Sequence, residues 1–532
     1  MLTVTINTQK NDYDNHATSA DRQSIYATML LSLEGGVVRS VQEELTEQIL
    51  AARKSATARA RAPHSRLSLL LDSDSFVEYG ALAGRTSKAD DNITADGLVG
   101  GVGNIAGAPV VVACYDTDLL DGQQSDRNLR KMAKLLYLSA EHRWPFVCFA
   151  DGKGARPDDP RSPPPIAVTP RGRFDLLDGL AEINGWAPTV SIVGGACHDG
   201  HAAIAMLTDC TITVKNATFQ AHGGPAISAE DYAQAGNVDL IVATEAEAIA
   251  AARRYLEFYL LATADAVTVP ENAAQIGDVI PENRRRPYDM RNVMTALVDQ
   301  DSALELAPKW GRSMLTAFAR LGGRTIGVYA NQPKSPLAGA IDADAADKAA
   351  RFIELCDAYD YPIVSLIDNP GYMVGPKAER DGIARHHARP LAALHHRSVP
   401  LYAVQLRKAY GLGPYAMSGW GSARRVPELR LAWPSVESGG MSLEGAAYLV
   451  KRKEILAAEN SEEALRIRDT YAESMRDANS GLRAARSYQF DDVILPAETR
   501  PRIISMLHKL RPREMPKPQQ EGGHKRHTID LR

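Results

Sequence analysis

The sequence has little of what secreted, metal-binding or membrane-spanning proteins usually require. Among 532 residues there are only five cysteines, and no two of them have the spacing C-x-x-C, which argues against a zinc ribbon or a disulfide framework. The chain has no N-terminal apolar segment of the signal-peptide kind and no apolar run of about 18 residues, so secretion and membrane spanning are both disfavoured. We therefore expect reduced core thiols, a cytoplasmic location and no membrane partner.

An excess of charge of one sign is also lacking. The formal net charge is −4, from 61 basic and 65 acidic side chains, which argues against a general nucleic-acid binder. A local basic patch for a phosphorylated ligand is still compatible with this balance. Hydrophobic residues make up 45% of the chain and charged residues 24%, which are the proportions of an ordinary globular protein.

What the sequence does contain is an internal repeat over most of its length. Gly107 precedes a valine-rich run as Gly323 precedes another, and 323 minus 107 is 216. Pro145 and Pro362 each open a buried run that ends in aspartate, and 362 minus 145 is 217. Further matches are 70–78 with 297–305, at an offset of 227, and Gly223-Gly224 with Gly439-Gly440, at an offset of 216. The first half thus has 11 extra residues (227 minus 216), which we place in the polar loop around 87–97.

Each half alternates apolar strands with helical segments. The predicted strands are 110–113, 145–150, 188–193, 325–329 and 363–367, and the predicted helices are 127–138, 174–183, 244–256 and 345–359. Such βαβ alternation predicts an α/β fold with a mainly parallel sheet in each half. A duplicated pair of domains of about 200 residues fits the usual domain size.

Four segments stand outside this alternation. Residues 39–62 are predicted to form a helix that packs on a neighbour, and 451–477 a charged helix that is solvated or faces another subunit. The proline-rich segment 155–165 is interpreted as a loop that covers the site as a lid or wall. Residues 270–287, rich in proline, glycine and asparagine, are interpreted as the interdomain linker.

A strand that runs into a glycine turn and then a helix start occurs in both halves. In the first half, 191–193 leads into Gly194-Gly195 and a helix-compatible segment from Gly200, and in the second half 399–406 leads into Gly411. Backbone N–H groups at such turns stabilise developing negative charge. The two turns predict two anion sites, and hence two oxygens to stabilise.

Several motifs closely resemble those of the biotin-dependent acyl-CoA carboxylase carboxyltransferase family. They are 75–78, 95–99 and 223–225 in the first half and 330–333, 347–352, 368–372, 407–411 and 432–435 in the second. The resemblance runs in order over roughly residues 40–510, which is far more specific than any single glycine motif.

The resemblance implies two tandem crotonase-like carboxyltransferase domains, an N-terminal one at 67–287 and a C-terminal one at 288–532. A flexible tail (1–34) and a helical extension (35–66) would precede them. In the family the active site lies where the first domain of one subunit meets the second domain of another. The resemblance therefore implies a homo-oligomer, a dimer as the minimum and a hexamer as in the family.

The family's chemistry implies which backbone groups matter. Carboxybiotin on a partner chain gives up CO2, and the enolate of an acyl-CoA thioester attacks it, so the thioester oxygen and the biotin ureido oxygen must both be stabilised. By matching position, the first pair of catalytic donors is the N–H groups of Asp199 and Gly200. The second pair lies within 411–415, where Pro414 has no N–H, so Leu412 and Gly413 are the candidates. The loss of one such donor typically raises the barrier by about 3 kcal/mol.

This chain departs from the family's glycine pattern at the first site, where it reads His198-Asp199-Gly200-His201. The Asp199 side chain either points away or pairs with one of three histidines, which would mark recognition of a polar acyl group. The predicted substrate-binding residues are His198, His201, His222, Gly223, Gly224, Tyr410, Gly411 and Tyr415.

The turn before the helix at 127–138 supplies candidate contacts to CoA, namely Gln123, Gln124, Ser125 and Lys131. Lys131 has a counterpart at Lys348, so the alternative is that both lysines are structural. No metal site is predicted. The chain has neither a Met-Lys-Met biotinylation motif nor the glycine-rich signals of an ATP-grasp enzyme, so the resemblance implies a biotin carboxylase and a biotin carboxyl carrier as partner chains. An acyl-CoA decarboxylase subunit of the same family and a catalytically weakened assembly subunit are the alternatives.

Overall fold

The computed structural model describes residues 41–85, 94–156, 176–261, 263–264, 266–419, 426–476, 481–509 and 528–530. It consists of two units, 1–56 and 57–532. The described part of the first unit belongs to helix α2 (Val41–Arg59), whose apolar side chains, such as Leu45 and Leu50, are exposed. The predictions for the tail 1–34 and for most of the loops 87–97 and 155–165 fall outside the described residues.

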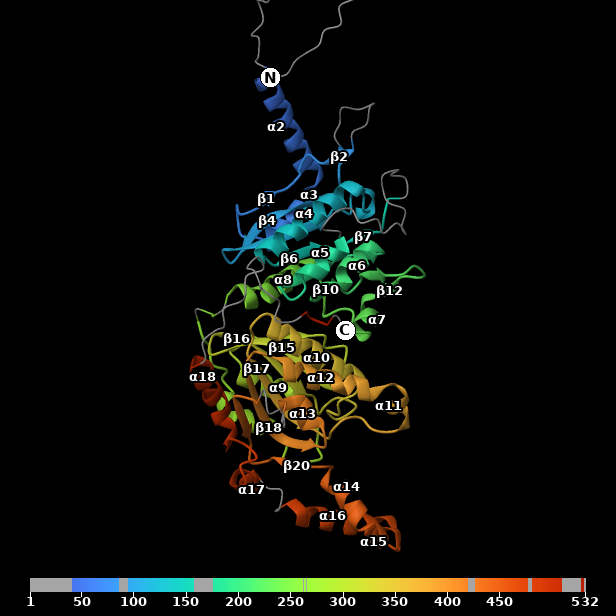
Figure 1. Ribbon diagram of the computed structural model, residues 1–532, viewed down its shortest axis with the longest axis vertical. Coiled ribbons are helices and arrows are strands. Elements are labelled where there is room, and N and C mark those ends of the chain that lie inside the picture. The colour runs from blue at the N-terminus through green and yellow to red at the C-terminus, as the bar shows by residue number, and fades with distance from the viewer. Residues whose placement is uncertain are drawn as a thin grey trace, which may run out of the picture. The chain divides into compact units, whose positions relative to one another are not determined.

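The second unit contains two large sheets with the same topology (Figure 1). The first has the order β1-β4-β5-β6-β8-β10-β13. Its strands are β1 (Val77–Glu78), β4 (Leu98–Ile105), β5 (Ala108–Tyr115), β6 (Phe146–Phe149), β8 (Thr189–Val193), β10 (Cys210–Val214) and β13 (Leu240–Val242). The pairings β1–β4 and β4–β5 are antiparallel and the others are parallel.

The second large sheet follows the order β14-β15-β16-β17-β18-β19-β21, again with two antiparallel pairings before the parallel ones. Its strands are β14 (Leu304–Leu306), β15 (Met314–Leu321), β16 (Arg324–Asn331), β17 (Ile363–Asn369), β18 (Leu401–Tyr410), β19 (Leu429–Ala432) and β21 (Asp492–Val493), with β20 (Glu437–Gly439) paired to β18. The two smaller sheets contain β12 (Ile227–Ser228), β11 (Thr218–Gln220), β9 (Ala196–His198) and β7 (Gly152–Lys153), and β2 (Gly84–Arg85) and β3 (Thr94–Ala95). The α/β fold with mainly parallel sheets is confirmed.

The duplication also extends to single hydrogen bonds. The Asp72 carboxylate accepts hydrogen bonds from the Gly107 N–H and from the Arg253 guanidinium. The same guanidinium also donates to the Leu70 carbonyl. At the same place in the second half, the Asp299 carboxylate accepts hydrogen bonds from the Gly323 N–H and from the Arg500 guanidinium. The Arg500 guanidinium also donates to the Leu297 carbonyl. The predicted matches at 107 and 323 and at 72 and 299 are therefore confirmed in the geometry.

One predicted match has the wrong register. Gly439 lies inside β20, and its carbonyl accepts the Gly411 N–H. In the first half the corresponding carbonyl is that of Gln220 in β11, which accepts the Asp199 N–H. The structural offset is 439 minus 220, or 219, so the alignment of Gly223 with Gly439 was wrong by three residues (439 minus 223 is 216).

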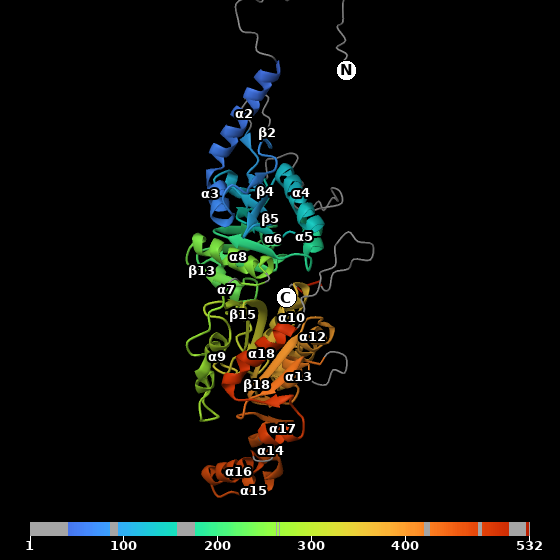
Figure 2. The ribbon, with the colours of Figure 1, turned by 90° about the vertical axis from the view of Figure 1, so that its left-hand side faces the viewer.

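Helices cover both faces of each sheet. Those of the first half are α3 (Arg61–Leu70), α4 (Asp126–His142), α5 (Leu176–Ile183), α6 (Gly200–Met206), α7 (Ala229–Gln234) and α8 (Glu245–Leu260). Figure 2 shows α3 and α8 on one side of β4 and β5, with α4 and α5 on the other. Alternating strand residues pack accordingly, since Val110 and Val112 contact the α3 and α8 side while Val111 contacts α4 and α5.

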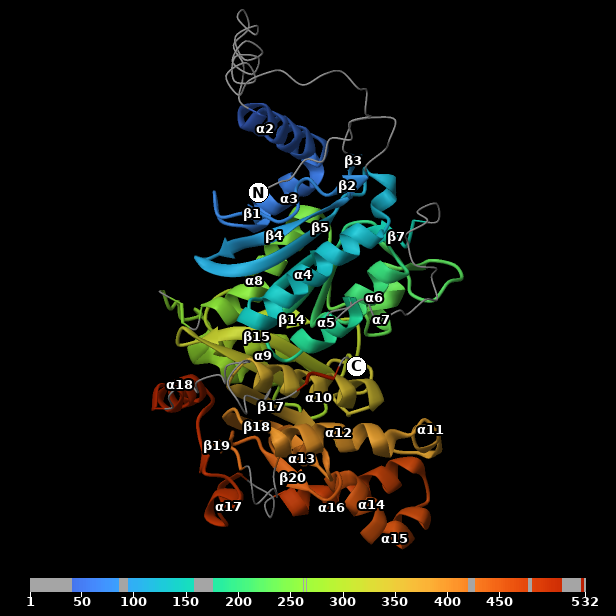
Figure 3. The same cartoon turned by 45° about the horizontal axis from the view of Figure 1, so that its top comes forward.

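The second half repeats this arrangement. Its helices are α9 (Met290–Leu297), α10 (Ala343–Ala358), α11 (Pro376–Arg380), α12 (Ile383–His396), α13 (Gly413–Ser418), α14 (Leu443–Val450), α15 (Arg452–Leu456), α16 (Ser461–Arg476), α17 (Gly481–Arg486) and α18 (Thr499–Lys509). Helices α9 and α18 share a core on one sheet face, and α10 and α12 lie on the other. The α10 core is continuous with that of α3 and α8, so the two halves share one hydrophobic core. Figure 3 shows α14, α15 and α16 grouped together.

Two predicted boundaries need correction. The boundary between residues 66 and 67 falls inside α3, because Leu67 and Leu70 of that helix are buried in the core of the first half. Residues 270–287 are more than a linker, since they contain the 3₁₀ helix η2 (Ala273–Val279), whose Ile276 packs with α9. Short polar segments with a single buried apolar side chain give too weak a periodic signal to be recognised.

Two further expectations, on the cysteines and on the cap of the helix at 244–256, hold. All five cysteines are buried and unpaired, and α8 starts with Thr244 as its N-cap, whose side chain accepts the Glu247 N–H. No helix in the described ranges has the length and apolar character needed to cross a bilayer.

Candidate active site

The first predicted turn joins β9 to α6. Asp199 lies between them with φ 50° and ψ −115°, a backbone conformation that residues other than glycine rarely adopt. Its N–H donates to the Gln220 carbonyl at 2.8 Å. The prediction that Asp199 is an oxyanion donor is therefore wrong in this conformation, because its N–H completes the ladder between β9 and β11.

The role of Gly200 as a donor stays a prediction. It is the first residue of α6, and no backbone carbonyl of the described residues accepts its N–H. A Cβ on Gly200 would lie 2.1 Å from Oε1 of Gln124. Gln124, buried below the turn and within 3.3 Å of the Tyr115 hydroxyl, therefore requires glycine here. Because the Asp199 N–H is bonded to the Gln220 carbonyl, the Gly200 N–H is the remaining candidate donor of the first turn.

The second turn, between β18 and α13, has the same construction. Gly411 takes the place of Asp199, with φ 60° and its N–H bonded to Gly439 O at 2.9 Å. Leu412 and Gly413 follow, and no backbone carbonyl of the described segments accepts from either N–H. Their predicted role as donors stays a prediction, with a geometry suited to it.

Asn369 supports the second turn as Gln124 supports the first. A Cβ on Gly413 would lie 2.0 Å from Oδ1 of Asn369, an oxygen that already accepts the Gly371 N–H at 2.9 Å. The Asn369 amide also donates to Asn331. Each half therefore has a buried amide under the first turn of its helix, a feature that we did not predict from the sequence.

The predicted histidine cluster does not form. The His198 ring lies 3.4 Å from the Thr218 hydroxyl, and His222 is exposed. His201 is fully buried against the edge of the Tyr115 ring. The exposed Asp199 carboxylate packs against Gly154, where a Cβ would lie 2.4 Å from it. The idea that the Asp199 carboxylate pairs with histidines is therefore wrong for the described residues, because the carboxylate packs against Gly154 instead.

His201 gives a testable pH effect. Burial lowers its pKa from 6.5 to about 4, so the unfolded chain binds the proton first and the folded state loses stability as pH falls from 6.5 towards 4. For a shift of this size the loss is about 3 kcal/mol. We expect the melting point of His201→Leu to fall less than that of the wild type between pH 7 and pH 4.5. His222→Leu, which changes an exposed histidine, is the control, and parallel profiles for wild type and His201→Leu would contradict the argument.

Asp199→Gly tests the strained turn. Relief of a positive φ contributes roughly 1 kcal/mol, so we expect a slightly higher melting temperature. Because the carboxylate contacts none of the three histidines, we also expect an unchanged ranking of acyl-CoA substrates. A lower melting temperature, or a ranking that shifts towards plain acyl groups, would show that the side chain has a role of its own.

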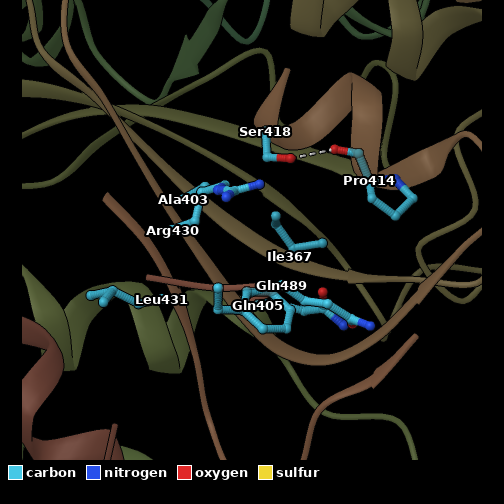
Figure 4. Close-up of a pocket in the computed structure, with 9 residues that line it drawn as sticks. Ile367, Ala403, Gln405, Pro414, Ser418, Arg430, Leu431 and Gln489 are labelled. Atoms are coloured by element: carbon cyan, nitrogen blue, oxygen red, sulfur yellow. Dashed lines mark hydrogen bonds between the residues drawn. The ribbon is translucent and has the colours of Figure 1, made fainter. Parts of the chain in front are cut away.

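The other predicted substrate-binding residues lie around the two turns. Gly223 and Gly224 follow β11, where the Gln220 side chain donates to the Gly224 carbonyl. Tyr410 is buried and donates to Glu437, while Tyr415 is partly exposed on α13. A small cavity of about 20 Å³, room for about one water molecule, lies beneath Pro414 and Ser418 of α13 (Figure 4). It is too small for a substrate group.

The four predicted CoA contacts have mainly structural partners here. Ser125 caps α4 and donates to Asp96, and Gln123 accepts from Asn128. Lys131 donates to the Leu98 carbonyl. Lys348, its counterpart, donates to three carbonyls, those of Ala307, Trp310 and Met314. These contacts favour the structural alternative for the two lysines, and the CoA contacts stay predictions.

Two aspartates that end matched strands were noted in the sequence only as part of the repeat. In the structure, Asp151 and Asp368 are both almost fully buried. Asp368 forms an ion pair with Arg407 at 2.9 Å, and Asp151 borders a pocket of about 230 Å³. No group of three or more metal-ligating side chains is found among the residues that the structure describes.

Comparison with known proteins gives one consistent result. Residues 58–523 match the family model described as the carboxyl transferase domain. The methylmalonyl-CoA carboxyltransferase 12S subunit of Propionibacterium freudenreichii subsp. shermanii is 32% identical over 86% of this chain and 90% of its own. The biotin-dependent long chain acyl-coenzyme A carboxylase beta4 subunit of Mycobacterium tuberculosis is 32% identical over 85% of this chain and 89% of its own.

Solved structures agree. A transcarboxylase 12S crystal structure, described as a hexamer with methylmalonyl-coenzyme A bound, aligns with a TM-score of 0.72 at 29% identity, over 90% of this chain and 98% of that one. A single-chain, multi-domain long-chain acyl-CoA carboxylase aligns with a TM-score of 0.78 at 34% identity over 88% of this chain. This chain spans about half (49%) of that larger protein.

Proposed function

The chain belongs to the carboxyl transferase domain family, and from that premise we propose that it transfers a carboxyl group between biotin on a partner chain and the α-carbon of an acyl-CoA. The observation that supports this most is the pair of equivalent turns, at Gly200 and at Leu412 and Gly413, whose N–H groups lack backbone acceptors within the described residues. Two fixed, neutral donor sites match a reaction with two oxyanions.

The chain's own residues supply stabilisation and not proton transfer. Carboxybiotin, when bound, supplies the carboxyl group and a base for the α-proton. The Gly200 N–H on one turn, and the Leu412 and Gly413 N–H groups on the other, are the donors that we assign to the thioester and ureido oxygens. Because such donors need no reorganisation as negative charge develops, they lower the barrier without a titratable side chain.

We propose that the two turns act together across a subunit interface. They lie on separate sheets, the first at β9 and the second at β18, and a site that needs both is completed by a second copy of the chain. The hexamer described for the 12S structure is consistent with such an arrangement. A biotin carboxylase and a biotin carrier are the further partners in this proposal, and the buried, unpaired cysteines fit a cytoplasmic location.

The reverse half-reaction tests this function. Purified chain should transfer carboxyl from malonyl-CoA or methylmalonyl-CoA to free biotin, and it should co-purify with a biotinylated chain. No transfer from either donor, with the oligomer intact, would favour the weakened assembly subunit. Transfer together with a partner set that lacks a biotin carboxylase would favour the decarboxylase.

A further inference from the structure

The strand β20 contacts the second donor turn at two points. The Gly439 carbonyl accepts the Gly411 N–H at 2.9 Å, and the Glu437 carboxylate accepts a hydrogen bond from the Tyr410 hydroxyl. Tyr410 is the last residue of β18 and is only 2% exposed, so its bonded hydroxyl is not available to a substrate. Hydrogen bonds of both backbone and side chain therefore hold the residues that enter the turn.

The Glu437 carboxylate joins three segments of the chain. Its Oε1 accepts from Tyr410, and its Oε2 accepts from Arg284 at 3.2 Å and from Arg476 at 3.4 Å. Arg284 lies between η2 and α9, and Arg476 is the last residue of α16. A buried carboxylate is costly unless its oxygens accept hydrogen bonds, and both oxygens of Glu437 have donors. Burial, together with the Glu437 carboxylate, raises the pKa of Tyr410, so its hydroxyl stays a donor at neutral pH.

The matched pair in the first half has a different composition. His198 is the last residue of β9, as Tyr410 is of β18. By the register of the strand pairs β9–β11 and β18–β20, Thr218 occupies the position of Glu437. The Thr218 hydroxyl lies 3.4 Å from the His198 ring. The duplicated fold therefore keeps the position of the contact but has a hydroxyl in one half and a carboxylate in the other, and the hydrogen bond to the carboxylate is the stronger kind.

The residue after each pair gives a physical reason for the difference. The first turn has Asp199 at φ 50°, and the second has Gly411 at φ 60°. Glycine has more conformational freedom to lose than any other residue, so the turn at Gly411 depends more on its neighbours for a fixed direction. Donors for a developing oxyanion must be fixed before the reaction. A charge-assisted hydrogen bond on the preceding residue supplies this fixation.

We propose that Glu437 is a positioning residue, which holds the second donor turn through the Tyr410 hydroxyl. The inference rests on the proposed function, because it concerns the direction of the Leu412 and Gly413 N–H groups. Neither Glu437 nor Tyr410 touches the reacting atoms. Since the donors act on charge that develops in the transition state, loss of the pair lowers kcat and leaves the binding of acyl-CoA unchanged.

Carboxyl transfer from malonyl-CoA or methylmalonyl-CoA to free biotin, measured on the full-length chain below its melting temperature, tests the proposal. Tyr410→Phe keeps the ring and removes the hydroxyl. We expect kcat to fall about 10-fold, since the donors are misdirected but still present, and the KM for the acyl-CoA to change less than about twofold. Glu444→Gln is the matched control and should keep the wild-type kcat. It removes another carboxylate that binds Arg476, at 3.1 Å, and leaves the Tyr410 hydrogen bond intact.

Hydrogen exchange, followed by mass spectrometry, gives a readout that needs no activity. The peptide that contains the N–H groups of 411–415 should exchange faster in Tyr410→Phe than in the wild type, because the turn is held less firmly. In Glu444→Gln it should exchange at the wild-type rate.

Glu437→Ala removes the acceptor of the same hydrogen bond. Its kcat should fall about as far as that of Tyr410→Phe, and the double variant should fall no further, because the two side chains act as one unit. An unchanged kcat or an unchanged exchange rate in Tyr410→Phe, or losses that multiply in the double variant, would each overturn the inference. If Glu437→Ala does not fold, Tyr410→Phe alone decides. Absence of transfer by the wild type overturns the proposed function, and the exchange rates then decide whether the pair holds the turn.

Discussion

Replacement of Gly200 by proline is expected to lower kcat/KM for carboxyl transfer about 100-fold, because it deletes one oxyanion donor. Any side chain at this position also collides with Gln124, whose Oε1 would lie 2.1 Å from a Cβ. The comparison is therefore made in a Gln124→Ala chain, in which that oxygen is absent. There, Gly200→Ala adds the carbon but keeps the N–H, and Gly200→Pro removes the N–H.

The difference in kcat/KM between these two double variants measures the contribution of the Gly200 N–H alone. Both should keep the oligomer size and melting transition of the Gln124→Ala parent, since proline is accommodated in the first turn of a helix. If the proline chain transfers carboxyl as fast as the alanine chain, the Gly200 N–H is not a donor.

Gly413→Ala should have an effect at least as large, a loss of kcat/KM of about 100-fold or more. The new Cβ would lie 2.0 Å from Asn369 Oδ1 and 3.1 Å from the Gly371 Cα. Asn369 is fully buried and accepts a hydrogen bond from the Gly371 N–H. Its side chain therefore cannot move to another rotamer to make room for the new Cβ. The turn that presents the Leu412 and Gly413 N–H groups must shift instead.

Gly440→Ala is the control for the second half. A Cβ there meets nothing within 4 Å, so we expect normal activity and stability. Steady-state transfer to free biotin, measured with melting curves on both variants, checks the prediction. Normal transfer by Gly413→Ala with an unchanged melt would mean that the second turn is not part of the site.

Local patterns predicted much of this fold. The apolar runs of the strands, the Thr244 cap and the glycines at 107 and 323 are properties of a few adjacent residues, and they were recognised correctly. Long-range contacts were not. The Asp199 N–H is taken by Gln220, and Lys131 is bound to Leu98, a residue 33 positions upstream (131 minus 98), so no pattern near either residue reveals its partner.

The failure to predict the pocket at Asp151 has the same cause. The pocket at Asp151 is lined by Arg66 of α3, Lys153 of β7 and Gly194, which follows β8, and these segments meet only in the folded protein. The signal that was available is the repeat itself, which matched Asp151 with Asp368. Comparison of matched positions for differences in their partners, and not only for similarity, would have drawn attention to Asp151.

Complementation between two inactive chains tests the central claim, that one catalytic site combines the Gly200 turn of one subunit with the Leu412 and Gly413 turn of another. Gly200→Pro and Gly413→Ala chains are co-expressed, and carboxyl transfer to free biotin is measured on the mixed oligomer. With random pairing, about half of the dimers are mixed and each has one intact site of two, so the account predicts about a quarter of wild-type activity. Mixed oligomers that form at normal size but stay as inactive as either parent would contradict it.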